Sequence, residues 1–155
     1  MYSDTITLFN RYESRAGDTW YATVLHNVHL NIDKAAILAK YGAESSDAAM
    51  LNVKYDLVNG KIMIQGKTWL PPKEWDKQLN DDYSHTITFT DGSMFDFFMV
   101  GEWADMPDDG VIMDEDYDAS GGFYNYMNDK YDYVFAISKV GGPYTVIPHF
   151  EITGR

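Results

Sequence analysis

The stretch of the sequence richest in candidate metal-ligating oxygens is residues 105–118, which holds seven acids and no base in fourteen residues. Carboxylates are ligands that Ca²⁺ prefers, and an EF-hand loop also needs a glycine at its sixth position. A loop that starts at Asp105 places Pro107, which has no side-chain oxygen, where the second ligand is needed. A loop that starts at Asp114 lacks the glycine and ends on asparagine. We therefore predict a long solvated or repelling loop and no metal site, with calcium binding left open.

Histidines are the other candidate metal ligands, and the chain has His26, His29, His85 and His149. His26 and His29 lie in an expected strand, where side chains three residues apart point to opposite faces. They can hold one ion together only if that strand contains a bulge. The chain has no cysteine, which excludes disulfide bonds, thiolate metal sites and cysteine nucleophiles. We predict no metal and no cofactor.

Motifs of catalytic nucleophiles are absent. The sequence contains no G-x-S-x-G, no phosphate-binding glycine loop and no G-x-G-x-x-G. With 24 acids, some carboxylates lie close together by chance, so a glycosidase pair is not identifiable from sequence. Exposed tryptophans can stack on sugars, but Trp20 and Trp69 lie in strand-like patterns that favour the core. We predict a protein that is not an enzyme and has no catalytic residues.

The elements that position these residues are mainly β-strands, because apolar and polar residues alternate in several stretches. In one of them the predicted core face consists of Trp20, Ala22, Val24, His26, Val28 and Leu30. In two others the core face holds Leu51, Val53, Tyr55 and Leu57, and then Tyr144, Val146, Phe150 and Ile152.

Glycine-containing turns predict two hairpins. Asn59-Gly60 lies between residues 55–58 and 61–65, and Asp91-Gly92 lies between residues 85–90 and 94–100. Such pairs supply the positive φ angles of a type I′ turn. Near the C-terminal end, Gly141-Gly142-Pro143 predicts a turn between two strands. Pro148 has no backbone N–H, so the last strand is expected to be an edge strand or to carry a bulge.

Two stretches carry helix signals. Residues 122–130 place Phe123, Tyr126 and Met127 on one stripe, which predicts a helix. Residues 33–41 suit a short helix or a tightly packed strand, and both stay open. Residues 132–140 are apolar on both faces, as in a central strand. We predict a single mostly β (α+β) domain over residues 1–155, an antiparallel β-sandwich or barrel with one or two short helices.

The charge balance bears on partners. The formal net charge is −12, which repels phosphate backbones and anionic membranes, so we predict no specific nucleic-acid binding. No apolar run approaches the roughly 18 residues of a membrane span, so we predict no membrane partner. The first residues lack the features of a signal peptide, so we expect a cytoplasmic protein or one released by lysis. Solubility or a basic protein partner would each explain the charge.

Six segments carry a family resemblance. They are TITLFNRYES (residues 5–14), WYATVLHNVHL (20–30), AKYGAESSDAAMLNVKY (39–55), WLPPKEW (69–75), TITFTDGSMFDFFMVGEW (86–103) and KYDYVFAISKVGGPYTVIPHFEITGR (130–155). On these segments the chain resembles an uncharacterised family of phage and prophage proteins of Gram-positive bacteria, which is associated with minor capsid and head–tail joining proteins. None of the segments carries a chemical mechanism, so the resemblance implies context and brings no catalytic residues.

The resemblance implies a structural protein of the head–tail junction, of connector or minor capsid type, in the host bacterial cytoplasm and then in the virion. Its partners would be other phage structural proteins, with a homo-oligomeric ring as one arrangement. We expect the C-terminal edge strand to extend a neighbour's sheet and the acidic loop to repel DNA in a ring lumen. Residues 69–75 are either another interface or a strand exit packed on the core. The alternative is a small β-sandwich binding module that recognises carbohydrate or a host protein.

Overall fold

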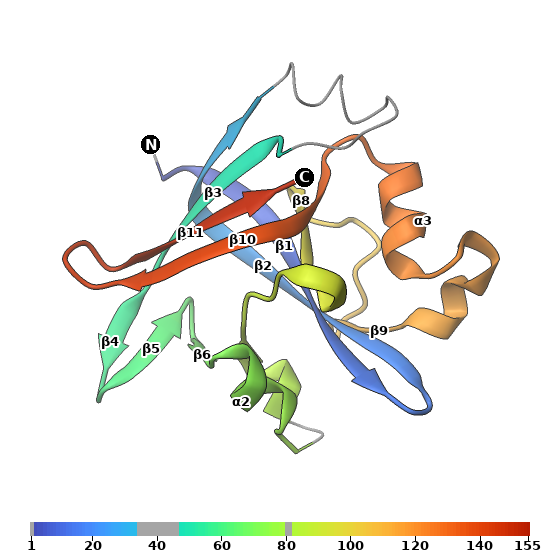
Figure 1. The fold of residues 1–155 in the computed structure, drawn as a ribbon, viewed down its shortest axis with the longest axis horizontal. Coiled ribbons are helices and arrows are strands. Elements are labelled where there is room, and N and C mark those ends of the chain that lie inside the picture. Colours follow the sequence, from blue (N-terminus) through green and yellow to red (C-terminus); the bar gives the residue numbers. More distant parts are fainter. Residues whose placement is uncertain (1, 34–46, 80–81) are drawn as a thin grey trace.

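The computed structural model describes residues 2–33, 47–79 and 82–155, and β-strands dominate it (Figure 1). The strands are β1 (Asp4–Ser14), β2 (Gly17–Ile32), β3 (Ala49–Lys54), β4 (Asp56–Val58), β5 (Lys61–Ile64), β6 (Lys67–Trp69), β7 (Thr86–Ile87), β8 (Phe97–Val100), β9 (Val111–Met113), β10 (Val134–Tyr144) and β11 (His149–Gly154). The helices are α2 (Pro72–Asp76) and α3 (Phe123–Lys130), with 3₁₀ turns η1 (Asp82–Ser84), η2 (Gly92–Met94) and η3 (Asp114–Ser120).

Six strands close into an antiparallel barrel in the order β1-β8-β10-β11-β3-β2, and β2 returns to pair with β1. A smaller sheet, β4-β5-β6-β7, continues from one side of the barrel. The predicted mostly β class is confirmed, and of the two architectures expected the structure is the barrel. Its interior is filled by buried apolar residues that include Ile6, Leu8, Leu25, Leu51, Phe98, Phe135, Phe150 and Ile152.

A second apolar cluster lies outside the barrel, where α3 packs against the strands (Figure 1). Phe123 and Met127 of α3 are fully buried in it, which confirms the predicted helix and its apolar stripe. The ring centroids of Phe9 and Phe123 lie 5.3 Å apart in an edge-to-face contact. Because of this cluster, β1, β8 and the start of β10 are buried on both faces, as predicted for the strand in residues 132–140.

The single core face predicted for β2 is wrong. Trp20 and Ala22 lie in the outer cluster, whereas Val28 and Leu30 belong to the barrel interior. Between them β2 contains a bulge at Asn27, whose φ is 53°, and the register with β1 shifts there. A bulge inserts one extra residue, so the alternation changes phase and residues of one sequence pattern are divided between both sides of the barrel wall.

The side-chain amide of Gln65 joins the smaller sheet to this bulge. Gln65 and Gly66 form the turn between β5 and β6, with φ angles of 48° and 87°. The amide oxygen accepts a hydrogen bond from the backbone N–H of His26 at 2.9 Å, and the amide NH₂ donates to the carbonyl of the same residue. The register gives His26 no partner in β1, so one side chain satisfies two backbone groups that the bulge releases.

One of the two predicted hairpins is confirmed and the other is wrong. Asn59-Gly60 joins β4 to β5 with φ angles of 52° and 77°. Asp91-Gly92 does not join two paired strands, because β8 pairs with β1 on one side and with β10 on the other. The preceding strand β7 pairs instead with β6, in parallel.

Of the two expectations for the last strand, an edge strand or a bulge, the edge strand is wrong. β11 pairs with both β10 and β3, so barrel closure leaves it no free edge. Pro148 precedes this strand, at the end of the turn over residues 145–148. Gly141-Gly142-Pro143 lies within β10, where the register with β11 shifts, and forms no turn between strands.

Two further expectations concern loops. Residues 105–118 are not one long loop, because they contain β9, which pairs with β2, and most of η3. Residues 33–41, for which helix and strand were both open, lie outside the described residues except for Asp33. In the part of the chain that the structure describes, no helix is long and apolar enough to cross a membrane.

We predict that Gln65→Met lowers the free energy of unfolding by about 0.5–1.5 kcal/mol, because methionine makes neither hydrogen bond to the bulge. Gln65→Glu keeps an acceptor for the N–H of His26 but turns its second carboxylate oxygen toward the carbonyl of that residue, so it should also lower the free energy of unfolding. Urea unfolding of the three proteins measures both differences. A Gln65→Met variant as stable as the wild type would show that water replaces the amide at no cost.

Candidate functional site

Exposed apolar side chains gather at one end of the barrel. We call this surface the apolar end, and it consists of Tyr144, Val146 and Ile147 on the β10–β11 hairpin and Leu57 and Val58 on the β4–β5 hairpin. Val146 is 96% exposed, Ile147 66% and Leu57 63%. Among the described residues, five of the ten exposed large apolar side chains lie here. A clustered exposed apolar surface is typical of a protein–protein contact.

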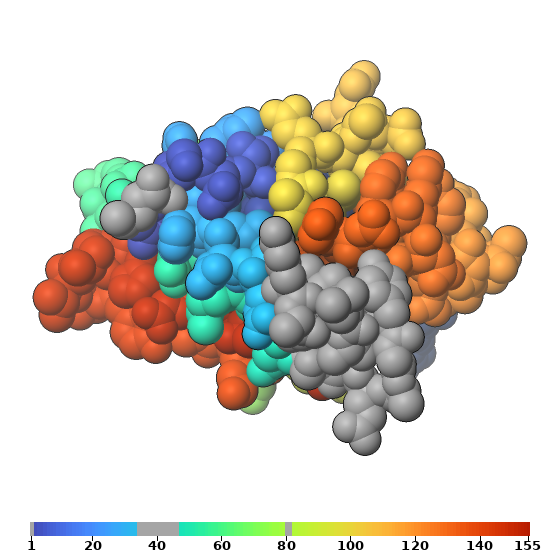
Figure 2. Space-filling view, turned by 90° about the horizontal axis from the view of Figure 1, so that it is seen from above, coloured from blue at the N-terminus to red at the C-terminus, as the bar shows by residue number. Residues whose placement is uncertain are grey.

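Tyr55, the residue before β4, joins the two hairpins of the apolar end at their bases. The backbone N–H of Tyr55 donates to the carbonyl of Pro148 at 3.3 Å, and its hydroxyl donates to the carbonyl of Tyr144 at 2.6 Å. Figure 1 places both hairpins at the left with their tips apart, and Figure 2, turned by 90°, again shows separate red and green residues at that end. The apolar end is therefore formed by two exposed hairpin tips that are joined at their bases.

The side chain of His149 contacts the turn of the β10–β11 hairpin. Its imidazole Nδ1 lies within hydrogen-bond distance of the Ile147 carbonyl, and its Nε2 lies 3.2 Å from a carboxylate oxygen of Glu151. The Ile147 carbonyl, followed by Glu151, raises the pKa of His149, since both stabilise the protonated ring. A protonated His149 can donate to both groups at once.

Sequence patterns predict that Leu57, Tyr144 and Val146 face the core, and the structure corrects this. Tyr144 ends β10, Val146 lies in the turn that follows it, and Leu57 lies in β4 of the smaller sheet, so the alternation continues at positions that no core covers. A signal was present in the sequence, because residues 140–148 contain no charged side chain in a chain that is 23% charged. Uncharged hairpin tips of this kind are expected at interfaces.

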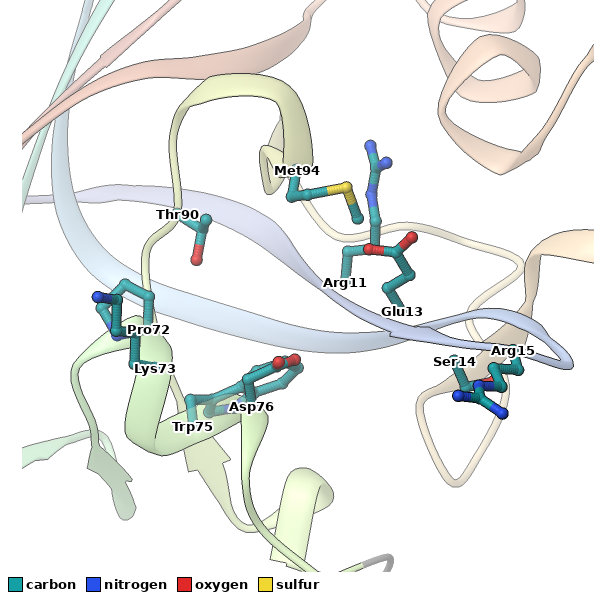
Figure 3. Close-up of a pocket in the computed structure, with 10 residues that line it drawn as sticks. All are labelled: Arg11, Glu13, Ser14, Arg15, Pro72, Lys73, Trp75, Asp76, Thr90 and Met94. Carbon is teal, nitrogen blue, oxygen red and sulfur yellow. The ribbon is translucent and has the colours of Figure 1, made fainter.

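A groove of about 440 Å³ opens elsewhere on the surface, between α2 and the end of β1 (Figure 3). We call it the α2 groove. In Figure 3, Pro72 and Lys73 lie at one end and Ser14 and Arg15 at the other. The apolar residues that line the groove are Pro72, Trp75 and Met94, the basic ones are Arg11, Arg15 and Lys73, the acids are Glu13 and Asp76, and Ser14 and Thr90 complete it.

An aromatic cluster fixes one wall of the α2 groove. Tyr83 packs against Tyr12, Tyr21 and Trp75, with ring centroids 4.6, 5.4 and 4.9 Å away. The hydroxyl of Tyr83 donates to the carbonyl of Asp76 at 2.7 Å, and burial raises the pKa of this tyrosine to about 12. These contacts hold α2 against the β1–β2 hairpin.

The two tryptophans of residues 69–75 pack on the core, as one of the two interpretations of this segment expects, whereas residues 71–74 between them are exposed. Trp69 ends β6 and lies 5.0 Å from the ring of Phe150, and Trp75 is buried in α2. Trp20 and Trp103 are buried as well. None of the four tryptophans is exposed, so none offers the sugar-stacking surface considered from the sequence.

The buried carboxylate of Asp96 holds the other wall of the groove. The backbone N–H groups of Arg11 and Thr90 donate to it at 2.8 and 2.9 Å, and both residues line the groove. The side-chain NH₂ of Asn10 donates to it at 2.9 Å. Burial raises the pKa of Asp96 to about 7, although the hydrogen bonds from Arg11, Asn10 and Thr90 favour the charged form.

The guanidinium of Arg11 is fixed between two rings. It lies 4.5 Å from the ring centroid of Trp20 and 4.8 Å from that of Phe95, and Asp18 is 3.8 Å away. Burial raises the pKa of Asp18, while Arg11 opposes that rise. Positive charge at the end of β1 is therefore structurally fixed by cation–π contact.

Asp114 of the acidic segment has a structural role that the sequence did not predict. Its carboxylate accepts hydrogen bonds of 2.9 Å from the indole N–H of Trp20 and from the backbone N–H of Phe123, the first residue of α3. A carboxylate at a helix N-terminus stabilises the helix. The interpretation of residues 105–118 as a surface that only solvates or repels is therefore wrong at this position.

Candidate metal ligands do not gather in the described ranges, where no group of three or more histidine and acidic side chains is placed to hold an ion. The bulge that a joint site of His26 and His29 would need is present at Asn27. His26 nevertheless lies 3.7 Å from Glu102, and His29 lies against the ring of Tyr2.

Comparison with known proteins identifies a family. The model of the family of unknown function DUF6751 matches residues 1–155. The chain belongs to this family. No curated protein and no solved structure matches it. Membership in DUF6751 does not carry an activity, so the function must be argued from the apolar end and the α2 groove.

We predict a pH-dependent stability difference between the wild type and Asp96→Asn. The pKa of Asp96 is about 7 in the folded protein against 3.8 for an ordinary aspartate, so the native state holds a proton that the unfolded chain releases between these values. The stability that this proton contributes is present below about pH 4 and lost as the pH rises through about 7. Asparagine does not titrate.

Urea unfolding of both proteins at a series of pH values measures the difference in unfolding free energy. The wild type should lose stability relative to Asp96→Asn as the pH rises from about 4 to about 8. A difference that stays constant over this range would contradict the assignment, whatever the absolute cost of the asparagine.

Proposed function

We propose that this protein is a non-enzymatic structural component of a phage or prophage particle, placed at the head–tail junction, which acts by protein–protein assembly. The observation that carries the proposal is the apolar end. A free protein that exposes Val146, Ile147 and Leu57 gains about 25 cal/mol for each Å² of apolar surface that a partner covers. The phage context comes from the family resemblance of the sequence.

The form of the apolar end also supports assembly. The β10–β11 hairpin is held at its base by Tyr55 and at its turn by His149, so this hairpin loses little conformational freedom on binding. The expected contact through the edge of the last strand is not available, because β11 is paired on both sides. In this proposal the hairpin tips, and not the edge of the last strand, contact the neighbouring subunit.

The alternative function, a small binding module for carbohydrate or a host protein, would use the same surface differently. A module that binds carbohydrate would have to use tyrosines for stacking. Tyr133 and Tyr144 are exposed, whereas no tryptophan is. Its host-protein form would predict a partner outside the particle. The location of the protein after phage production separates the two functions.

We predict that particles purified from a lysogen that encodes this chain contain it as a constituent, with portal, capsid or tail genes beside its gene. Quantitative mass spectrometry of gradient-purified particles measures its copy number relative to the portal protein. Absence from the particles, together with a gene neighbourhood free of portal, capsid and tail genes, would contradict the proposed function.

The apolar end is tested in the same particles with two aspartate variants. Val146→Asp should lower incorporation about tenfold or more, because burial of an unpaired charge in an apolar contact costs at least 1.4 kcal/mol. Leu79→Asp is the matched control, since Leu79 is 79% exposed and lies outside the apolar end. Melting curves check that both variants fold. Equal incorporation of the two variants would show that the apolar end is not the contact surface.

A further inference from the structure

We propose that His149 is a pH-sensitive clamp on the β10–β11 hairpin: its charged ring holds the turn over residues 145–148, and its neutral ring releases that turn. The turn carries Val146 and Ile147, the most exposed side chains of the apolar end. The inference concerns the free protein, and it rests on the proposed function only where it names assembly as the process that the clamp regulates.

The turn extends beyond the pairing of its two strands. The last paired residues of β10 and β11 are Tyr144 and His149, so residues 145–148 lie outside the ladder. The two hydrogen bonds that Tyr55 donates reach the ends of the turn. The carbonyl of Ile147 lies inside the turn, within hydrogen-bond distance of the ring Nδ1 of His149. The ring therefore holds a part of the turn that neither the ladder nor Tyr55 reaches.

Both nitrogens of the ring face oxygen acceptors. Nδ1 faces the carbonyl of Ile147, and Nε2 lies 3.2 Å from a carboxylate oxygen of Glu151. A carbonyl and a carboxylate accept hydrogen bonds without donating them, whereas a neutral imidazole has one N–H and one lone pair. Only the imidazolium, with two N–H groups, satisfies both acceptors at once. The side chain of His149 is 19% exposed, so this is the arrangement of a charged and largely enclosed ring.

Loss of one proton forces a choice between the two acceptors. A hydrogen bond to a charged acceptor is about twice as strong as one between neutral groups, so the remaining proton stays on Nε2, which faces Glu151. Nδ1 then presents its lone pair to the carbonyl of Ile147, and two electron-rich atoms at hydrogen-bond distance repel each other. We therefore expect the neutral ring to release the turn and to keep its contact with Glu151.

Titratable and charged groups surround the ring on three strands. Glu151 lies on β11 itself, and the ring centroid of Tyr144 in β10 lies 5.1 Å from that of His149. On the other side, Lys54 of β3 pairs with His149. The ammonium of Lys54 lies 4.1 Å from the ring centroid of Tyr2, so this cation is held by another aromatic ring. The carboxylate of Glu151 contacts the imidazole directly, which favours its charged form.

The direction of the pH dependence follows from the two states of the ring. The carbonyl of Ile147, followed by Glu151, raises the pKa of His149 above its ordinary value of 6.5. The stability that the clamp contributes is therefore fully present below about pH 6.5 and is lost as the pH rises through the raised pKa. The turn should be ordered at the lower pH and mobile at the higher one, so assembly through Val146 should be stronger in mildly acidic solution.

Nuclear magnetic resonance of the ¹⁵N-labelled protein tests the clamp in the wild type. The nitrogen shifts of the His149 ring report its charge and which nitrogen keeps the proton, and the heteronuclear NOE of amides 145–147 reports the motion of the turn. Between about pH 5 and about pH 9 we expect a change from two N–H groups to the Nε2–H tautomer. The NOE values of the turn should fall over the same range.

Two variants separate the parts of the clamp. In His149→Gln no ring titrates, so the motion of the turn should no longer change with pH. His85→Gln is the matched control and should behave like the wild type, because His85 is exposed and lies just before β7, outside the hairpin. In Glu151→Gln the amide can donate to Nε2, so the remaining proton moves to Nδ1 and the turn should stay ordered at high pH. Melting curves check that each variant folds.

Any of three results would overturn the inference. NOE values of the turn that stay constant while the wild-type ring titrates would show that the ring does not hold the turn. A pH dependence that persists in His149→Gln would assign it to another group. Turn motion that rises with pH in Glu151→Gln as in the wild type would show that the carboxylate does not decide the tautomer. None of these results changes the incorporation measured with Val146→Asp, so the proposed function is tested separately.

Discussion

Closure of the barrel by the pairing of β1 with β2 is the constraint on which the rest of the structure depends. An open sheet would leave edge strands available to neighbours, and closure removes them. The surfaces that remain available for contact are then the hairpin tips, the helices α2 and α3 on the outside of the barrel, and the short strands beside it. This is why the apolar end, rather than the last strand, is the prominent candidate contact.

Two polar side chains maintain this closure at positions where strand pairing alone fails. Gln65 supplies the hydrogen bonds that the bulge of β2 lacks, and Asp96 connects β1 to the segment before β8. Each replaces a backbone partner by a side chain from a distant part of the sequence. Such contacts decide how the smaller sheet and the α2 groove sit on the barrel.

Sequence patterns predicted correctly those elements that depend only on residues close together in the sequence. The Asn59-Gly60 hairpin and the helix of residues 122–130 follow from turn chemistry and from a stripe that includes Phe123 and Met127. The Asp91-Gly92 hairpin failed because β8 finds two better partners that are distant in sequence. The alternation of apolar and polar residues does not indicate which strand will pair with β8.

The candidate surfaces were harder to predict for a related reason. The alternation of β3 continues into β4, and that of the last strand begins before the turn at Val146, so the pattern does not say where the core stops. The α2 groove combines residues from positions 11 to 94, which only the fold brings together. The absence of cysteines and of nucleophile motifs argues against several kinds of chemistry, but it does not indicate which surface binds a partner.

The barrel's closing contacts also affect how the chain folds. Ile6 pairs with Val100, and Ala49 pairs with Gly154, so strands made early must wait for partners made much later. Folding rates fall as the sequence separation of contacts rises. During synthesis on a ribosome the apolar strands β1 to β3 would stay incompletely covered until β11 has emerged, and in that interval the negative charge of the chain opposes its aggregation.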